Sequence, residues 1–298
     1  MLKIKNLSKT YSNGVRALKN VSLDIPQGMF GLLGPNGAGK SSLMRTIATL
    51  QDPDSGSIHL GGRDLLADKA ATRRILGYLP QDFGVYPRVS VQDMLDHYAI
   101  LKGVTRRGER RDLVAALLKQ VNLWDVRRQK LGTFSGGMRR RFGVAQALIG
   151  QPELIIVDEP TAGLDPEERN RFLNLLAEIG EKVVVILSTH IVADVTDLCP
   201  RMAIIGKGEV LLEGRPHEAI DSLEGQVWQA AVDKDGIEGY RQRLTVLSTH
   251  LSLGKIRIHV LADASPGPEF RPVPPSLEDV YFARLLMQAG RIDAAEAA

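Results

Sequence analysis

The sequence has little cysteine and no long apolar run. Its 298 residues include one cysteine, Cys199, so no disulfide can form within the chain, and a reducing compartment suits it. The longest apolar runs, such as VVVIL at residues 183–187, fall far short of the roughly 18 residues of a membrane-spanning helix. The opening MLKIKNLSKTY alternates like a strand and lacks the apolar core of a signal peptide. We therefore expect a soluble protein of the cell interior, with any membrane role supplied by a partner.

An excess of one charge sign is missing as well. Lysine and arginine number 38 against 35 acidic residues, and the net charge of +3 is too small to indicate a nucleic-acid partner by itself. The three consecutive arginines at 139–141 would fan around a helix axis without forming one basic face, so we expect no nucleic acid. The apolar content of 44% is ordinary for a globular protein. The length allows one large domain or a domain with an appendage.

The stretch GPNGAGKSS predicts a phosphate loop between a strand at 29–33 and a helix at 41–50. Its glycines allow backbone N–H groups to curl around a β-phosphate, where a Cβ would obstruct. We expect Lys40 to reach the β- and γ-phosphates, Ser41 to ligate Mg²⁺ and Ser42 to donate to the α-phosphate. The loop residues expected to bind the nucleotide are Gly34, Pro35, Asn36, Gly37, Ala38, Gly39, Lys40, Ser41 and Ser42. The loop predicts a bound nucleoside triphosphate but does not separate a kinase, a GTPase and an ATPase.

Two carboxylates, Asp158 and Glu159, follow a continuous apolar strand at 154–157. Strands of this kind belong to a buried parallel sheet, whose carboxyl ends form the ligand crevice. Asp158 is placed to hold Mg²⁺, and Glu159, free of the metal, to polarise the attacking water as general base. The pair favours hydrolysis over transfer to a bound acceptor. A small-molecule kinase also needs a lid and an acceptor pocket, which the sequence does not display.

Polar residues end two further predicted strands. Gln81 follows ILGYLP, and its side chain can reach the metal or the water. His190 closes the buried strand KVVVILSTH at the same edge of the crevice. The five other histidines support no functional interpretation; they are His59, His97, His217, His250 and His259.

A second anion-binding helix start is predicted at GTFSGGMRRR. Ser135 can cap the helix, and Gly136 and Gly137 let a ligand approach the free N–H groups at the positive end of the helix dipole. This site has no lysine. The residues alone leave open which phosphate this second site would hold.

As a set, and in this order, the motifs resemble the nucleotide-binding subunit of an ABC transporter over residues 1–218. They are the phosphate loop, the glutamine loop at Gln81, the signature FSGGM, the strand LIIVDEP, the D-loop AGLDP with Asp165, and the histidine switch at His190. The resemblance implies that Gln81 and His190 join Glu159 in catalysis, and that Ser41, Gln81 and Asp158 hold Mg²⁺. It also places Tyr11 where the family stacks an aromatic ring on adenine.

The resemblance implies a head-to-tail dimer. In the family, the signature helix of one subunit caps the γ-phosphate held by the loop of the other, so Ser135, Gly136, Gly137 and Asp165 would contact ATP across the dimer. The signature departs from the commonest family pattern at Phe134 and Met138, where Leu and Gln are usual. Both positions lie outside the Ser-Gly-Gly core, and we expect tuning without loss of function.

We expect an α/β fold: a P-loop NTPase (ABC ATPase) core with an antiparallel β subdomain, a helical subdomain and a small α+β C-terminal extension. Residues 1–27 and 55–65 alternate like strands of the antiparallel sheet, and residues from about 86 to 150 are helical. The boundary between ATPase domain and extension is expected at 218/219. The junction QDFGVYP is where the family receives a cytoplasmic helix of the permease.

The extension at 219–298 is expected to contain strands with a hairpin near Gly254. A proline-rich linker, ASPGPEFRPVPP, then leads to a helix that Ser276 caps with Asp279 three residues on. Its small size resembles exporter-type subunits that pair with a separate permease, because sugar importers carry a larger β-rich domain. We expect it to take no part in the chemistry.

Together these features predict an ATPase that uses ATP and Mg²⁺, works as a homodimer or paired with another ATPase subunit, and binds the cytoplasmic face of the cell membrane through a permease. Two other functions stay open. One is a soluble non-transport ABC ATPase acting on ribosomes or DNA, although such proteins usually fuse two ATPase units or carry coiled coils. The other is a P-loop small-molecule kinase, which would not need the Ser-Gly-Gly helix.

Overall fold

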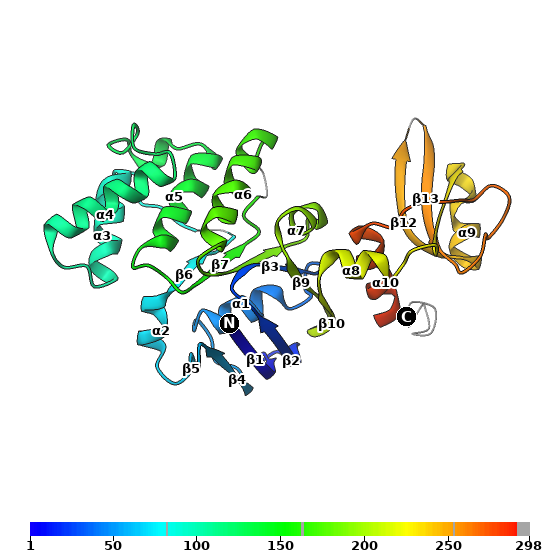
Figure 1. Ribbon diagram of the computed structural model, residues 1–298, viewed down its shortest axis with the longest axis horizontal. Coiled ribbons are helices and arrows are strands. Elements are labelled where there is room, and N and C mark those ends of the chain that lie inside the picture. The colour runs from blue at the N-terminus through cyan, green and yellow to red at the C-terminus, as the bar shows by residue number, and fades with distance from the viewer. Residues whose placement is uncertain (82, 162–163, 253, 291–298) are drawn as a thin grey trace.

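A six-stranded sheet forms the centre of the molecule (Figure 1), in the order β10-β9-β3-β8-β7-β6. Its strands are β3 (Gly28–Leu33), β6 (Leu76–Leu79), β7 (Leu154–Asp158), β8 (Val184–Thr189), β9 (Arg201–Gly206) and β10 (Glu209–Gly214). Neighbours are parallel except β10, which is antiparallel to β9. The carboxyl ends of β3, β6, β7 and β8 therefore meet at one edge. The structure is a computed structural model that describes residues 1–81, 83–161, 164–252 and 254–290.

Side chains of this sheet alternate between two hydrophobic cores, one on each face. In β7, Ile155 and Val157 belong to one core, and Leu154 and Ile156 belong to the other. The second core is completed by α1 (Lys40–Ile47) and by the antiparallel sheet β2-β1-β4-β5. The strands of that sheet are β1 (Leu2–Thr10), β2 (Arg16–Ile25), β4 (Ser55–Leu60) and β5 (Arg63–Asp64). A strand buried on both faces has no polar side, which explains its continuous apolar sequence.

Helices complete the first core, most of them in the helical layer at one end of the molecule (Figure 1). They are α3 (Val91–Leu101), α4 (Arg107–Gln120), α5 (Gly136–Leu148), α6 (Pro166–Gly180) and α7 (Val192–Leu198), while α2 (Lys69–Ile75) lies beside β6. The predicted fold class, with its antiparallel and helical parts, is confirmed. Within the described ranges, no helix combines the length and apolar character that crossing a bilayer requires.

The C-terminal part forms a second small sheet, in the order β12-β13-β11-β14. Its elements are α8 (Pro216–Asp221), β11 (Val227–Val232), α9 (Ile237–Arg243), β12 (Thr245–Ser252), β13 (Lys255–Leu261), β14 (Arg271–Pro272) and α10 (Leu277–Gln288). The hairpin between β12 and β13 contains Gly254 at φ 79°, as its position near the predicted turn requires. The predicted cap of α10 is present, because Ser276 and Asp279 exchange hydrogen bonds as a capping box.

The last helix, α10, returns to the ATPase core, where it packs on α7, α8, β9 and β10. Its buried Leu277, Val280 and Tyr281 belong to the same hydrophobic core as the helical layer. At its end, Gln288 donates from Nε2 to the carbonyl oxygen of Gly206, at 2.8 Å. The domain boundary at 218/219 stays a prediction, but the extension is attached to the core through its final helix as well as through α8.

Candidate active site

The phosphate loop connects β3 to α1 at the carboxyl edge of the central sheet. Gly37 and Gly39 have φ of 80° and 108°, values in the left-handed region that favours glycine. A Cβ on Gly39 would also lie 2.5 Å from the carbonyl oxygen of Ala17. Two glycines of the predicted motif are therefore required by the conformation of the loop itself.

Lys40 begins α1 and joins the loop to the end of β7. Its ammonium donates to the carbonyl oxygens of Gly34 (2.5 Å) and Pro35 (3.3 Å) and lies 3.7 Å from Glu159 Oε1. Burial lowers the pKa of Lys40 below its usual value, and the charges of Glu159 and Asp158 oppose that shift. The predicted phosphate-binding lysine and the predicted base thus form one buried ion pair.

Glu159 is held at both of its oxygens. Oε1 faces Lys40, and Oε2 lies 2.7 Å from Nδ1 of His190. The Glu159 side chain is 8% exposed, whereas His190 is 55% exposed. The backbone of Glu159 has φ of 48°, an uncommon conformation for a residue other than glycine, and the Glu159 N–H donates to the carbonyl oxygen of Ser188 at 2.8 Å. Glu159 therefore points in a fixed direction at the end of its strand.

Asp158 offers a buried carboxylate oxygen without a partner. Among the described residues, its Oδ1 accepts no hydrogen bond, and neither does the buried hydroxyl of Ser188, which pairs with Asp158 across β7 and β8. An unpaired buried carboxylate oxygen suits a cation. Mg²⁺ keeps several waters and needs only one or two carboxylates beside substrate phosphates. No group of three or more His, Cys, Asp or Glu in the described ranges is arranged to hold a metal, and the residues present fit magnesium bound in this sparse way.

A cleft of about 630 Å³ opens along the phosphate loop. It is lined by Tyr11, Pro35, Asn36, Gly37, Gly39, Lys40, Ser41, Ser42, Gln81 and Glu159 and by residues of the β1–β2 and β9–β10 turns. The hydroxyl of Tyr11 is 2.9 Å from Ser42 Oγ and donates to Gln51 Oε1 at 3.0 Å. The structure thereby brings together, from four separate segments, most of the residues that were predicted to hold one nucleotide.

Three cations in this cleft escaped the sequence analysis. Arg16 and Lys19 lie in the first residues of β2, and Lys207 lies in the turn between β9 and β10, at φ of 45°. All three suit a triphosphate, because clefts lined by one sign of charge concentrate ligands of the other. No local pattern marks these residues, since only the fold brings the start of β2 and the β9–β10 turn to the phosphate loop.

The second helix start lies apart from this cleft. Ser135, Gly136 and Gly137 do not line it, and Ser135 Oγ instead accepts the N–H of Met138 at 3.2 Å as the N-cap of α5. A Cβ on Gly136 would meet nothing within 4 Å, but one on Gly137 would lie 2.6 Å from Glu168 Oε2. Gly137 is therefore required by packing against α6, and this reason was absent from the sequence analysis.

Asp165 is likewise outside the cleft. It caps α6, and its Oδ1 accepts the N–H of Glu168 at 2.9 Å. Ala162 and Gly163 of the D-loop, and Asp82 of the QDFGVYP junction, lie outside the described residues. The predicted site residues therefore divide into those that line the cleft of one chain and those that lie outside it, at the starts of α5 and α6.

Comparison with known proteins identifies relatives of this chain by sequence. The sequence profile of the family described as ABC transporter matches residues 18–162. The chain is 37% identical over 227 residues to the linearmycin resistance ATP-binding protein LnrL of Bacillus subtilis, covering 76% of this chain and 72% of that protein. It is 35% identical over 277 residues to the methionine import ATP-binding protein MetN of Bordetella pertussis, covering 90% and 75% respectively.

Solved structures show the same architecture. A dimeric ATP-binding cassette, MJ0796, in a post-hydrolysis state bound to ADP and Pi, matches with a TM-score of 0.66 and 29% identity. The match covers 72% of this chain and 98% of that one. The part of the present chain that remains unmatched has a length similar to that of the C-terminal sheet with its final helix.

Proposed function

This chain belongs to the ABC transporter family of ATP-binding proteins, and we propose that it drives export through a separate membrane permease from the cytoplasmic face of the membrane. It is an ATPase, as its family membership establishes. The observation that carries the mechanism is the position of Glu159, whose carboxylate is buried and held between Lys40 and His190. A fixed carboxylate at the end of β7 suits a general base acting on water.

The residues of the cleft divide the chemistry between them. Lys40 and the N–H groups of the loop would hold the β- and γ-phosphates of ATP, and the ring of Tyr11 would face the adenine. Glu159 would accept a proton from the attacking water, while His190 fixes the direction of its carboxylate. When bound, magnesium would neutralise phosphate charge, and Ser41, Gln81 and Asp158 are the residues that would hold it.

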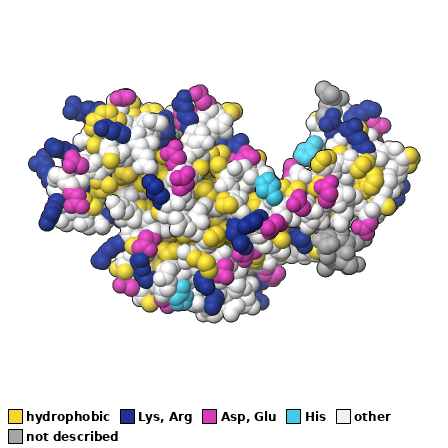
Figure 2. Space-filling model, in the orientation of Figure 1, with side chains coloured by type: hydrophobic (Ala, Val, Ile, Leu, Met, Phe, Trp, Pro, Cys, Tyr) yellow, Lys and Arg dark blue, Asp and Glu magenta, His cyan; other side chains and the backbone are white. Residues whose placement is uncertain are grey.

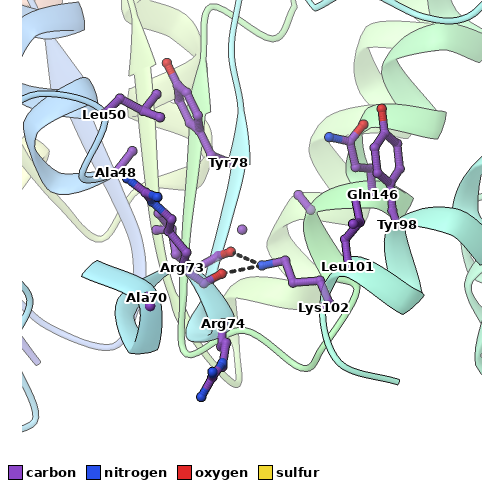
Figure 3. Close-up of a pocket in the computed structure, with 13 residues that line it drawn as sticks. Ala48, Leu50, Ala70, Arg73, Arg74, Tyr78, Tyr98, Leu101, Lys102 and Gln146 are labelled. Atoms are coloured by element: carbon purple, nitrogen blue, oxygen red, sulfur yellow. Dashed lines mark hydrogen bonds between the residues drawn. The ribbon is translucent and has the colours of Figure 1, made fainter. Parts of the chain in front are cut away.

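A groove supports a permease partner. It measures about 530 Å³ and lies between the ATPase core and the helical layer (Figure 3). Figure 3 shows Ala48, Leu50 and Tyr78 on one wall and Leu101 on the other, where Lys102 donates to two backbone carbonyls across the gap. Leu50 and Leu101 are 54% and 69% exposed, an apolar pair that suits the apolar face of a docked helix.

The groove is linked to the cleft through one short segment. Tyr78 lies in the groove and Gln81, three residues on, lies in the cleft, so a helix that displaces Tyr78 would also displace Gln81. Burial and then the charge of Asp158 raise the pKa of Tyr78 to about 12, as expected for a phenol close to the catalytic end of the sheet. This continuity favours a transport subunit over an ATPase that acts alone.

The working form that we propose is a dimer. Ser135, Gly136, Gly137 and Asp165 lie outside the cleft of their own chain. Ser135, Gly136 and Asp165 are exposed, so a second chain could contact them, whereas Gly137 is buried against α6. The dimeric relative MJ0796 supports this arrangement. The partner is a second copy or another ATPase subunit.

Export is the direction we propose, because the relative LnrL is named for resistance and the C-terminal extension is small. The specific observation that favours import is the match to MetN, which extends over 90% of this chain. Inverted membrane vesicles containing the chain and the permease encoded beside its gene distinguish the two. ATP-dependent uptake into these vesicles corresponds to export, and ATP-dependent loss of preloaded cargo would indicate import.

The permease contact is tested by Leu101→Asp, with Leu251→Asp as the matched control. Leu251 is 79% exposed on β12, far from the groove. We expect Leu101→Asp to abolish co-purification with the permease while the ATPase rate of the isolated chain stays unchanged, and Leu251→Asp to leave both intact. Full assembly of the Leu101→Asp variant would contradict the proposed docking groove.

A further inference from the structure

Asp194 is a fully buried carboxylate that the predicted catalytic set does not include. It lies on α7, its side chain is 0% exposed, and it does not line the cleft. Its Oδ2 accepts the hydroxyl of Thr161 at 2.8 Å, and its Oδ1 accepts Nε of Arg169 at 2.9 Å and also a second guanidinium nitrogen. Burying a charge is costly unless it is paired and hydrogen-bonded, and these three bonds supply the compensation.

The partners of Asp194 come from the segments that carry the predicted site residues. Thr161 lies two residues after Glu159. Arg169 lies one turn after Asp165, the N-cap of α6, and donates its N–H to the carbonyl oxygen of that residue at 2.9 Å. Asp194 itself lies one turn after His190. One carboxylate on α7 therefore joins the segment after β7 to the first turns of α6, 33 and 25 residues away in sequence.

These contacts connect Glu159, His190, Asp194 and Thr161 into one closed circuit, here called the ring. On one side, the Glu159 carboxylate meets His190, and α7 leads from His190 to Asp194. On the other side, Asp194 binds Thr161, and only Pro160 separates Thr161 from Glu159. A left-handed conformation costs a residue other than glycine of the order of 1–3 kcal/mol and persists only where its surroundings fix it. The ring supplies that fixation at Glu159, whose φ is 48°.

We propose that Asp194 is a positioning residue for ATP hydrolysis. It holds the segments of Glu159 and His190 so that Glu159 Oε2 and His190 Nδ1 remain 2.7 Å apart, and it acts through Thr161 and Arg169 without touching the nucleotide. The inference rests on the ATPase activity of the family and is independent of the permease and of the transport direction.

The test uses the full chain and measures ATP affinity and turnover separately. Asp194→Asn keeps the shape of the side chain but turns an amide N–H toward one of two donors, so the ring opens. We expect turnover to fall about ten- to a hundredfold, the effect of misplacing a catalytic group by about 1 Å, with ATP affinity within about twofold of the parent. Lys40 and its loop are untouched, which is why binding should survive.

The matched control is Val195→Ala, at the next position of α7. Val195 is also 0% exposed and packs against Gly31, so its truncation removes stability without touching the ring. We expect Val195→Ala to keep parental turnover at temperatures well below its unfolding transition. Equal loss of turnover in both variants would mean that Asp194 acts only by stabilising the fold, and it would overturn the proposal.

Thr161→Val provides a second, gentler variant in case Asp194→Asn does not fold. It preserves volume at a position that is 3% exposed and removes a single hydrogen bond from the ring. A severalfold lower turnover at unchanged ATP affinity supports the proposal, and the double variant should then be no slower than Asp194→Asn alone. Parental turnover in Thr161→Val, or in a folded Asp194→Asn, overturns it.

Discussion

At the scale of single residues, the two oxygens of one carboxylate have different partners. Glu159 Oε1 faces the ammonium of Lys40, and Oε2 faces the imidazole of His190. The carboxylate is thus held between the proposed phosphate-binding lysine and the proposed switch histidine. A change at Glu159 should separate binding from hydrolysis.

Glu159→Gln keeps the shape of the side chain and removes its basicity. We expect ATP binding to persist and turnover to fall about 10²- to 10⁴-fold, the range associated with loss of a general base. The variant should accumulate as an ATP-bound dimer in analytical ultracentrifugation. Glu153→Gln, at an exposed carboxylate paired with Arg63, serves as control and should turn over normally. Parental turnover in Glu159→Gln would assign the base to another group.

At the scale of elements, two adjacent glycines at the start of α5 have different roles. A Cβ on Gly136 would meet open space, whereas a Cβ on Gly137 would lie within 2.6 Å of Glu168 on α6. Glu168 also pairs with Arg141 of α5, at 3.3 Å. The start of α5 is therefore open at Gly136 and packed against α6 at Gly137.

This difference predicts opposite outcomes for two alanine substitutions. Gly136→Ala should raise the free energy of unfolding by up to about 1 kcal/mol, since alanine is the better helix former. Gly137→Ala gains the same propensity but must displace Glu168 from Arg141, so it should be about 1–3 kcal/mol less stable than Gly136→Ala. Urea denaturation of both variants measures the difference. Equal stabilities would mean that α5 and α6 separate easily.

The cap of α10 gives the stability a dependence on pH. Burial alone would raise the pKa of Asp279, but hydrogen bonds from His259 and Ser276 outweigh it and hold the pKa below its usual value. The folded state therefore binds fewer protons than the unfolded state at acid pH, so this contribution is complete above the usual pKa of about 4 and is lost as the pH falls through the lowered value.

Asp279→Asn should accordingly cost about 1–3 kcal/mol of unfolding free energy above pH 5 and progressively less below pH 4. Urea denaturation at a series of pH values provides the measurement, and Asp263→Asn, at an exposed carboxylate of the same part of the chain, provides the control. A difference that stays constant down to pH 3 would contradict the assignment of the cap.

The sequence predicts well those features that a local rule determines. The strand around Ile155, the strand, loop and helix around Gly39 and the capping box at Ser276 each follow from a short pattern, and the structure contains all three. Contacts between distant segments leave no such trace. Asp194 is indistinguishable in sequence from a surface acid on a short helix, and Lys207 from an ordinary turn residue.

The C-terminal part illustrates the same limit on a larger scale. Its strands and final helix were expected, but the return of α10 to the core was not. That return buries Leu277 and Val280 against distant segments, and Gln288 donates to the backbone of Gly206. Burial raises the pKa of Tyr281 on α10, and the charge of Glu159 raises it further. The extension was expected to take no part in the chemistry, and that stays a prediction, although Tyr281 on its last helix is close enough to feel the charge of Glu159.

At the scale of the whole molecule, the residues of the proposed composite site lie in different layers of the chain. Figure 2 shows both signs of charge over this face, including the α3–α4 end, where Asp and Glu side chains lie among Lys and Arg. The signature serine, Ser135, caps α5 of the helical layer, and Lys40 begins α1 beside the central sheet. In the proposed dimer, each complete site takes Lys40 from one chain and Ser135 from the other.

Mixing two inactive variants tests this arrangement. Lys40→Ala should lose ATP binding, and Ser135→Arg should bind ATP but block the partner's loop. In a mixed dimer, one site carries both lesions and the other is intact, so an equimolar mixture should regain about a quarter of the parental ATPase rate if the sites act independently. The recovered rate should rise faster than linearly with protein concentration. No recovery, with dimers present in sedimentation, would exclude sites shared between chains.

The strand order of the central sheet has a consequence for biosynthesis. β3, which leads into the phosphate loop, pairs with β8 and β9, and β8 begins about 150 residues later in the chain. At the usual speed of translation, roughly ten to thirty seconds separate the synthesis of the loop from that of the strands beside it. A ribosome-bound chain that has not yet reached β8 therefore contains the whole phosphate-binding motif but lacks the two strands that pair with β3. We expect the nascent chain to bind ATP only late in synthesis, after β8 and β9 have joined β3.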